Sequence, residues 1–368
     1  MQKIWIIISV IIAAIVLAVA LVPKRTIPTD DRPIIKIGAT LPLTGNLAPV
    51  GNSIKEALLM AQSEIPKDSK YRYELIIDDD QFEIKKTVSN VNKQISVNKI
   101  DAVLTVYDAA MRSVAPIAEK NKIPSIGCAW GKEFPKNYQY TFKHWSKPET
   151  QSAHFFDLLR DKKIQSIVIF YSNIASTQEL SHQLETDAKK NNVKILMSEY
   201  VNAGTRDFRA ELEKVRRMNP DAIMMEMFEP EMGIFVKQAR EAGLNIPYVS
   251  IDQLYDAYDK SALDGSEFVL SYDGTDEWKA KIARQTDLPI STCTANLYDA
   301  FKMLIDIYES ADYKLSGEEA KNKLYEIKNY PSALGMNVSV DAAGIIDAPL
   351  VRAIIVDGKV IKKKGTQE

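Results

Sequence analysis

Residues 34–61 read IIKIGATLPLTGNLAPVGNSIKEALLMA, and this stretch predicts the local architecture that recurs through the chain. Its first eight residues, 34–41, form a β-branched run that is typical of a buried strand. A turn sequence around Gly45 follows, and we expect a helix behind the caps Asn52 and Ser53. Its apolar residues recur at helical spacing: Ile54, Ala57, Leu58, Ala61 and Ile65. The stretch therefore predicts a strand, a loop and a helix.

The same unit recurs along the following sequence. YELII (73–77) precedes a helical pattern of Val88, Val91 and Ile95, DAVLTV (101–106) precedes a helical segment at 114–120, and IPSIG (123–127) is the next apolar run. Short strands that alternate with helices predict a parallel sheet with right-handed crossovers.

A second series of such units begins near Thr150. SIVIFY (166–171) leads to a helix with a predicted capping box at Ser176 and Glu179, and AIMMEMF (222–228) is the next strand. In EPEMGIFVKQAREAGL (229–244), Pro230 suits a first helical turn, Gly243 a C-terminal stop, and the buried stripe is Met232, Phe235, Val236 and Ala239. PYVSI (247–251) is a further strand. Two series predict two α/β lobes with a cleft between them.

The N-terminus carries 19 residues without a charge, from Ile4 to Val22, which is long enough to cross a bilayer as a helix. Ala18 and Ala20 give the small-x-small pattern of a signal peptidase site, so both a cleaved signal and an uncut membrane anchor are open. No cysteine directly follows the run, which excludes a lipoprotein anchor. We expect the remainder of the chain outside the cytoplasmic membrane.

Composition excludes some classes of partner. The 368 residues are 46% hydrophobic, and 47 basic against 49 acidic residues give a net charge of −2, so no large positive field points to nucleic acid. Cys128 and Cys293 are the two cysteines. They could pair outside the cell, but we expect both to be buried and free.

The sequence contains none of the common catalytic motifs. It has no phosphate-binding glycine loop, no G-x-S-x-G elbow and no H-E-x-x-H, so we predict that the protein is not an enzyme and needs no cofactor. Its three histidines, His144, His154 and His182, fall on separate predicted elements and do not predict a metal site.

Three consecutive carboxylates, Asp78 to Asp80, end the second predicted strand in YELIIDDDQFE (73–83). They could hold a metal ion, accept a phosphoryl group, or form the polar end of a buried strand. We favour the last interpretation, with the side chains satisfied at the strand end or at a helix cap, because neighbouring residues do not supply the converging ligands that a cation needs.

Four segments carry a resemblance to a known family: IKIGATLPLTGNLAPVGNSIKEALLMA, IIDDD, NYQYTF and EPEMGIFVKQAREAGL. From about Ile35 to Val360 the chain resembles the branched-chain amino acid-binding (Leu/Ile/Val-binding-like) family, the type I periplasmic solute-binding proteins of ABC transporters. The resemblance implies an α/β fold of two Rossmann-like lobes joined by three crossing strands, which close on a ligand by hinge motion.

The resemblance also implies where the lobes begin and end. The expected crossings are 138–145, 268–274 and 335–341. Residues 1–33 would be the N-terminal segment and spacer. Lobe one would comprise 34–143 and 275–335, and lobe two 144–270 and 336–364, the last part ending in a hairpin with its turn at Asp357 and Gly358.

Ligand-binding positions follow from the resemblance residue by residue. They are the loops after the third and fourth strands, with Asp108, Ala109, Ala110, Ala129 and Trp130, an aromatic wall at Phe228, and an acid for an ammonium group at Asp252. The family has hydroxyl side chains where this chain has Asp108, Ala109, Ala129 and Trp130. The substitution favours a ligand with an amine or amide, or one held by stacking on aromatic rings.

For Trp130 and Asp108 a structural role is equally open, namely interlobe packing and an N-cap, and for Asp252 the alternative is a turn cap. The implied function is an extracytoplasmic receptor that delivers a small polar ligand, an amino acid or an amide-like compound, to an ABC permease. The alternative is the ligand-sensing ectodomain of a signalling system.

Overall fold

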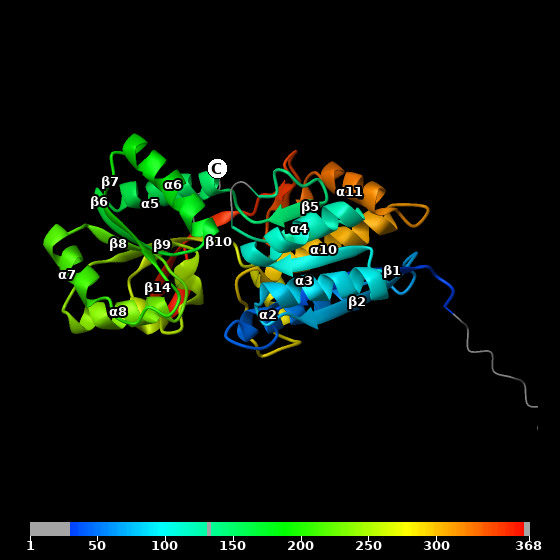
Figure 1. The fold of residues 1–368 in the computed structure, drawn as a ribbon, viewed down its shortest axis with the longest axis horizontal. Helices are drawn as coiled ribbons and strands as arrows, with labels where there is room; N and C mark the ends of the chain where they lie inside the picture. Colours follow the sequence, from blue (N-terminus) through cyan, green and yellow to red (C-terminus); the bar gives the residue numbers. More distant parts are fainter. Residues whose placement is uncertain (1–29, 131–133, 364–368) are drawn as a thin grey trace, which may run out of the picture. The chain divides into compact units, whose positions relative to one another are not determined.

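The computed structural model describes residues 30–130 and 134–363. From Ile34 onward the chain forms one compact unit, which contains two large β-sheets with helices on both faces (Figure 1). We call each sheet with its helices a lobe. The predicted hydrophobic span at residues 4–22 lies outside the described residues, and within the described part no helix is long and apolar enough to cross a membrane.

The first lobe is built on a six-stranded sheet in the order β13-β5-β4-β3-β1-β2. All its pairings are parallel. Its strands are β1 Ile34–Leu41, β2 Arg72–Asp79, β3 Ala102–Val106, β4 Ser125–Cys128, β5 Thr141–His144 and β13 Ile345–Ile346. Its helices are α2 Ala48–Ser63, α3 Ile84–Lys93 with the π-turn η1 Gln94–Asn98, α4 Asp108–Asn121, α9 Asp276–Ile282, α10 Thr294–Glu309 and α11 Gly317–Glu326.

Apolar side chains cover both faces of this sheet. One core unites β1 with α2 and α10, through Ile37, Leu58 and Phe301, all fully buried. The other core, with Val103 and Val114, lies under α3 and α4. Each central strand is therefore buried on both faces, which explains why its sequence is a continuous apolar run.

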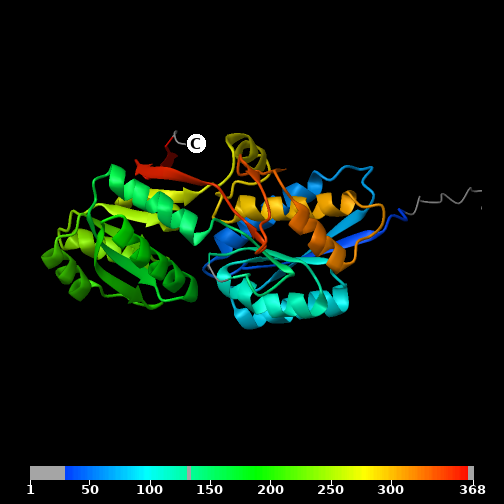
Figure 2. The same ribbon diagram turned by 90° about the horizontal axis from the view of Figure 1, so that it is seen from above.

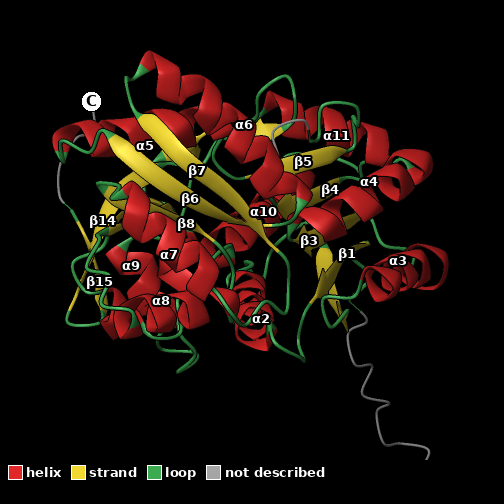
Figure 3. Ribbon diagram, turned by 60° about the vertical axis from the view of Figure 1, so that its left-hand side comes forward, coloured by secondary structure: helices red, strands yellow, loops and turns green. Residues whose placement is uncertain are grey.

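The second lobe has a seven-stranded sheet in the order β15-β14-β10-β9-β8-β6-β7. Its strands are β6 Ser166–Ser172, β7 Lys194–Val201, β8 Ala222–Glu226, β9 Tyr248–Ile251, β10 Glu267–Ser271, β14 Leu350–Val356 and β15 Lys359–Lys362. Its helices are α5 Pro148–Asp161, α6 Ala175–Lys190, α7 Arg209–Met218 and α8 Glu231–Glu241, with the short turns η2 Gln253–Asp256 and η3 Lys260–Leu263. Helices α5 and α6 cover one face of this sheet, and α7 and α8 cover the other (Figure 3).

The expected C-terminal hairpin is confirmed. Strands β14 and β15 pair antiparallel, with Val356 opposite Lys359. The two turn residues, Asp357 and Gly358, have φ angles of 50° and 68°, as a two-residue type I′ turn requires. The predicted stripe of α8 is also confirmed, since Met232, Phe235, Val236 and Ala239 are all buried.

Two predicted helix starts are wrong. Helix α2 begins at Ala48, so Asn52 lies inside it, and the Asn52 amide donates to the carbonyls of Leu43 and Ala48 at 3.0 and 2.8 Å. Pro49 in the first turn fixes the earlier start. Helix α6 begins at Ala175 with no side-chain cap, so the expected capping box at Ser176 does not form.

The chain passes between the lobes three times, and the third passage differs from the expected one. The resemblance implies that 336–364 belong to the second lobe, but β13 pairs with β5 of the first sheet. Val338, Val340 and Ile346 belong to the first core, and burial of these side chains keeps the segment in the first lobe. The passage therefore falls between β13 and β14.

Figure 2 shows the red C-terminal strands beside the yellow-green strands of the second sheet. Strands β11 Tyr330–Pro331 and β12 Asn337–Val338 form a small ladder before β13.

Cys128 and Cys293 form a disulfide, with their Cα atoms 5.8 Å apart. The expectation that both are buried is confirmed, at 0% and 2% exposed, but the expectation that both are free is wrong. Although 165 residues separate them in sequence, Cys128 ends β4 and Cys293 precedes α10, which packs against that strand. Only this packing brings the two sulfur atoms together.

Candidate ligand-binding cleft

A cleft of about 760 Å³ lies where the carboxyl ends of strands in both sheets meet. Of the predicted site residues, Trp130 of the first lobe and Phe228 and Asp252 of the second line it. This volume lies in the range of sites for small molecules. The position agrees with the rule that ligands of parallel α/β sheets bind beyond the carboxyl ends of the strands.

Trp130 belongs to an aromatic wall in the first lobe. Its ring stacks on Tyr107 at 5.5 Å between centroids and 12° between planes, and it packs against Trp145 at 5.0 Å. Among the described residues, the buried Trp130 Nε1 has no hydrogen-bond partner. Ring contacts therefore hold the wall in place, and the indole N–H of Trp130 is a hydrogen-bond donor without a partner among the described residues.

Tyr107 joins β3 to α4 with φ 70° and ψ 150°, a conformation that a residue other than glycine rarely adopts. Its backbone N–H donates to Cys128 O at 2.9 Å, so the loops after β3 and β4 are tied together. Burial, followed by the nearby Asp256 carboxylate and Tyr258, raises the pKa of Tyr107, and the phenol stays neutral. Strained backbone of this kind is concentrated at functional sites.

Asp108 is the first residue of α4, and its side chain makes no capping bond. Its Oδ2 instead accepts from Arg112 Nε at 2.7 Å, and Arg112 Nη2 reaches Glu179 Oε1 of α6 at 2.7 Å. The buried Oδ1 of Asp108 has no partner among the described residues. The carboxylate is therefore charge-paired but retains one acceptor.

The three alanines lie around the same loops. Ala109 is exposed, whereas Ala110 and Ala129 are 3% and 0% exposed. The Ala129 side chain packs with Met111, Ala115 and Phe134 in a small core beside α4. None of the three alanines is among the residues that line the cleft.

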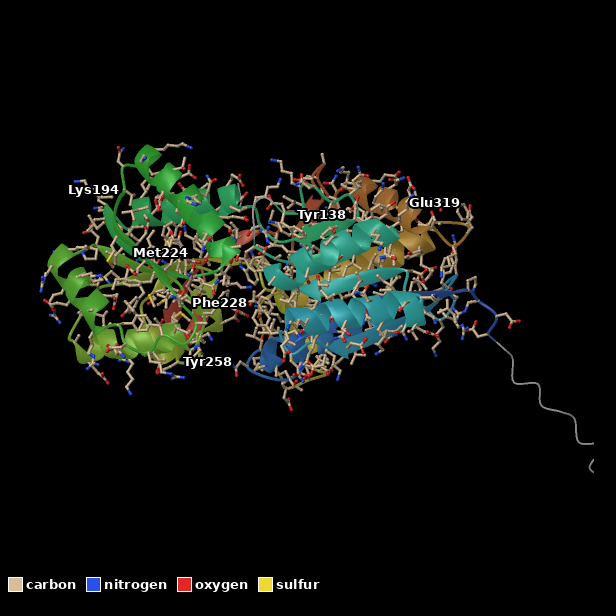
Figure 4. All side chains as sticks on the ribbon, viewed as in Figure 1. Tyr138, Lys194, Met224, Phe228, Tyr258 and Glu319 are labelled. Carbon is tan, nitrogen blue, oxygen red and sulfur yellow. A yellow bond between two sulfur atoms is a disulfide. The ribbon has the colours of Figure 1, made fainter. Side chains whose placement is uncertain are left out.

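Phe228 follows β8, and its backbone N–H donates to Ser172 Oγ at 2.9 Å. It lies on the side of the second lobe nearest to the first (Figure 4), as does Tyr258, which is 70% exposed. The second lobe therefore presents two aromatic rings toward the cleft, and both line it.

Asp252 follows β9 with a φ of 66°, and it is 3% exposed. Its carboxylate accepts from the Ser271 backbone N–H, from Ser271 Oγ at 3.1 Å and from Gln151 Nε2 at 3.3 Å. Burial raises its pKa to about 7, although these hydrogen bonds oppose the rise. The side chain does not cap η2. Its hydrogen bonds to Ser271 hold the last residue of β10, where the second passage between the lobes begins.

Asp256 and Thr292 also line the cleft, and neither is among the residues that the sequence predicts. Thr292 Oγ1 of the first lobe donates to the Asp256 carboxylate of the second. Asp256 could have been found, because it follows the carboxyl end of β9 closely. Thr292 precedes a helix rather than following a strand, so no sequence signal marks it.

The carboxylates of Asp78, Asp79 and Asp80 each pair or hydrogen-bond with other residues of the first lobe. Asp78 pairs with Lys93 at 2.9 Å. Asp79 accepts from Leu43 N at 2.9 Å and from Thr44 Oγ1 at 2.6 Å, and the buried Asp80 accepts from Thr40 and Thr87, both at 3.1 Å. The interpretation as a polar strand end is confirmed. Across residues 30–130 and 134–363, no group of three or more His, Cys, Asp or Glu could hold a metal ion.

Two α/β lobes, three chain passages between them and an interlobe cleft define a type I periplasmic-binding-protein fold. The sequence match agrees with the fold, because the family described as periplasmic binding protein matches residues 34–358. The chain belongs to this family. The family implies an extracytoplasmic location.

Individual relatives are distant. The leucine-, isoleucine-, valine-, threonine- and alanine-binding protein of Pseudomonas aeruginosa is 23% identical over 221 residues, which cover 58% of this chain. The match spans 59% of the length of that relative.

Solved structures support the fold along most of the chain. LivJ of Streptococcus pneumoniae, in complex with isoleucine, has a TM-score of 0.79 and 21% identity, covering 90% of this chain and 100% of that one. A solute-binding protein of Rhodopseudomonas palustris, in complex with 3,4-dihydroxybenzoic acid, has a TM-score of 0.79 and 19% identity, covering 90% and 96%.

Proposed function

We propose that the protein is an extracytoplasmic receptor that captures a small polar ligand in the cleft, closes over it and delivers it to an ABC permease. The observation that carries the proposal is the cleft of about 760 Å³, which residues of both lobes line. A ligand held there is buried from two sides, so binding favours the closed arrangement of the lobes.

The cleft chemistry favours an amino acid or a related amine or amide. Tyr107 and Trp130 offer an aromatic wall on one side, and Phe228 offers a ring on the other. The Asp256 carboxylate lines the cleft and provides an acceptor near Tyr107, where an ammonium or amide donor would be stabilised by charge and by the ring faces. Ala109, Ala110 and Ala129 do not line the cleft, so we propose no ligand contact for their side chains.

An aromatic carboxylic acid is a second candidate. The stack of Tyr107 and Trp130 can extend over a flat ring, and the Rhodopseudomonas palustris structure with 3,4-dihydroxybenzoic acid shares the fold. The two candidates differ in charge. Binding measurements with both classes therefore separate them.

A thermal-shift screen of amino acids, amides, polyamines and aromatic acids tests the proposal. A ligand at about 100 times its dissociation constant should add about 2.7 kcal/mol to the free energy of unfolding. Calorimetric titration then gives the affinity, and small-angle scattering should show a smaller radius of gyration with the ligand. If no compound raises the melting temperature, or if the radius stays unchanged on binding, the proposal is wrong. Co-purification with a permease, in the presence and absence of ligand, tests delivery.

A further inference from the structure

The hinge side of the cleft carries a cluster of charges that the sequence analysis did not single out. Asp273 lies just after β10, in the second passage between the lobes. Lys279 of α9 approaches its Oδ2 at 2.6 Å, and Lys362 of β15 pairs with its Oδ1. All three residues line the cleft. One lysine thus comes from each lobe, and both share a single carboxylate.

The carboxylate of Asp273 is already occupied. Besides the two ammonium groups, it accepts from Tyr255 Oη at 2.7 Å. The side chains of Lys279 and Lys362 are 26% and 22% exposed, and Lys362 Nζ lies 3.9 Å from the centre of the Tyr272 ring. Two positive charges against one negative charge leave an excess of positive charge facing the cleft.

The cleft is also lined by other charged side chains, namely Glu229, Asp252, Asp256, Lys260, Asp276 and Lys359. None of these is among the charges that act most strongly on Lys362, which are Asp273 and Lys279. Burial lowers the pKa of Lys362 to about 8, with repulsion from Lys279 adding to the effect and Asp273 opposing it. An added anion would stabilise the ammonium form of Lys362.

The aromatic wall has the opposite character. Tyr107 is flanked in sequence by Asp108, and Asp256 lies near enough to raise the pKa of its phenol. A carboxylate placed there would be repelled by both acids. An anionic ligand group is therefore accommodated better beside the two lysines.

We propose that Lys279 and Lys362, joined through Asp273 at the hinge side of the cleft, form a subsite for an anionic group of the ligand, such as a carboxylate. This inference rests on the proposed function and specifies the ligand class further. Because the two lysines belong to different lobes, an anion between them would also draw the lobes together. Ligands with an anionic group would then bind more tightly than neutral analogues of the same shape.

Matched variants and probes test the subsite. The variants are Lys279→Gln and Lys362→Gln. Their controls are Lys281→Gln, on the same helix but 2.8 Å from Glu64, and Lys363→Gln, which follows Lys362 but pairs with Glu267. The probes are benzoate against benzamide and L-leucine against L-leucinamide, which lacks the carboxylate, in calorimetric titrations. Sulfate against chloride at equal ionic strength, followed by melting temperature, probes the bare anion site.

We expect the parent to bind at least one acid about tenfold or more tightly than its amide. Each cleft variant should lose about ten- to a hundredfold in affinity for that acid, with the amide changed less than threefold. Both controls should keep the preference. Sulfate should stabilise the parent and both controls but neither cleft variant. This result supports the subsite even if no organic probe binds.

Equal affinity for acid and amide in the parent, or a preference that survives in both cleft variants, overturns the subsite and leaves the proposed function intact. If none of the four organic probes binds and sulfate gives no more stabilisation than chloride, the subsite is overturned as well. Failure of the wider ligand screen counts against the proposed function, and in that case the sulfate measurement on the parent and the two cleft variants decides the subsite.

Discussion

Arg112 of the first lobe and Glu179 of the second form an ion pair of 2.7 Å across the interlobe boundary. The same guanidinium binds Asp108, so one side chain joins a cleft-loop residue to the opposite lobe. Arg112 and Glu179 are 33% and 23% exposed in their side chains. At this degree of burial the pair is screened less than a surface pair, and it favours the arrangement in which the lobes are in contact.

Breaking this pair should weaken ligand binding without loss of the fold. We expect Arg112→Gln and Glu179→Gln each to lower affinity about three- to tenfold, because the contact holds the two lobes together. Calorimetric titration and scattering measure the effect. Arg160→Gln is the control, since Arg160 pairs with Asp157 within one helix. If both interlobe variants bind as tightly as the Arg160 control, the pair does not contribute to closure.

Asp252 should make stability depend on pH. Its pKa is raised to about 7, so the folded state binds the proton more tightly than the unfolded state, and stability falls as pH rises from about 4 to about 7. Asp252→Asn removes this loss while an amide still fits Ser271 and Gln151. We expect the variant to gain about 2–3 kcal/mol relative to the parent between pH 5 and pH 8, measured by urea denaturation.

Glu226 is a second buried carboxyl group that contributes to the pH dependence of stability. Burial also raises the pKa of Glu226, so part of the pH dependence remains in both proteins. The prediction therefore concerns the difference between the two curves. Parallel curves for the parent and Asp252→Asn would show that Asp252 does not titrate in this range.

The disulfide should stabilise the first lobe. Cys128→Ala combined with Cys293→Ala opens a loop of 165 residues in the unfolded chain, at an expected cost of about 2–5 kcal/mol. A thermal melt with and without reductant measures it. The parent should lose stability on reduction, whereas the double variant should be indifferent to reductant. A parent that melts at the same temperature under both conditions contradicts the prediction.

The aromatic walls should dominate ligand affinity. Trp130→Ala and Phe228→Ala each remove a ring that lines the cleft, and we expect losses of more than thirtyfold for the ligand found by screening. Tyr313→Ala, which removes a ring that is 61% exposed and outside the cleft, is the control. For Trp130, an affinity within threefold of the parent together with a lowered melting temperature would favour the packing role.

The core of the second lobe offers a test of stability alone. Phe235 is fully buried and packs against Phe170 and Phe208, at 4.5 and 5.3 Å between ring centres. Phe235→Ala should lower the free energy of unfolding by about 3–5 kcal/mol, because the cavity is lined by rigid neighbours. Val97→Ala, at a side chain that is 71% exposed, should change it by less than about 0.5 kcal/mol.

Local patterns in the sequence predict much of the fold. Strand β1 coincides with the predicted run 34–41, the α8 stripe is buried as expected, and the turn at Asp357 and Gly358 forms the terminal hairpin. Each of these features depends on neighbours within a few residues, namely side-chain period, β-branching and tolerance of positive φ. The same patterns do not determine where α2 and α6 begin, because Asn52 and Ser176 can serve as caps or as interior residues.

Contacts between distant segments were decided by the tertiary structure alone. The Cys128 to Cys293 bond, the ion pair of Arg112 with Glu179, and the shared carboxylate of Asp273 each join elements far apart in the chain. No periodicity encodes such pairs, because they depend on how α10, α6 and β15 pack after the local elements have formed. For the same reason the sequence could place Asp252 at a strand end, but only packing shows that Ser271 and Gln151 occupy its carboxylate.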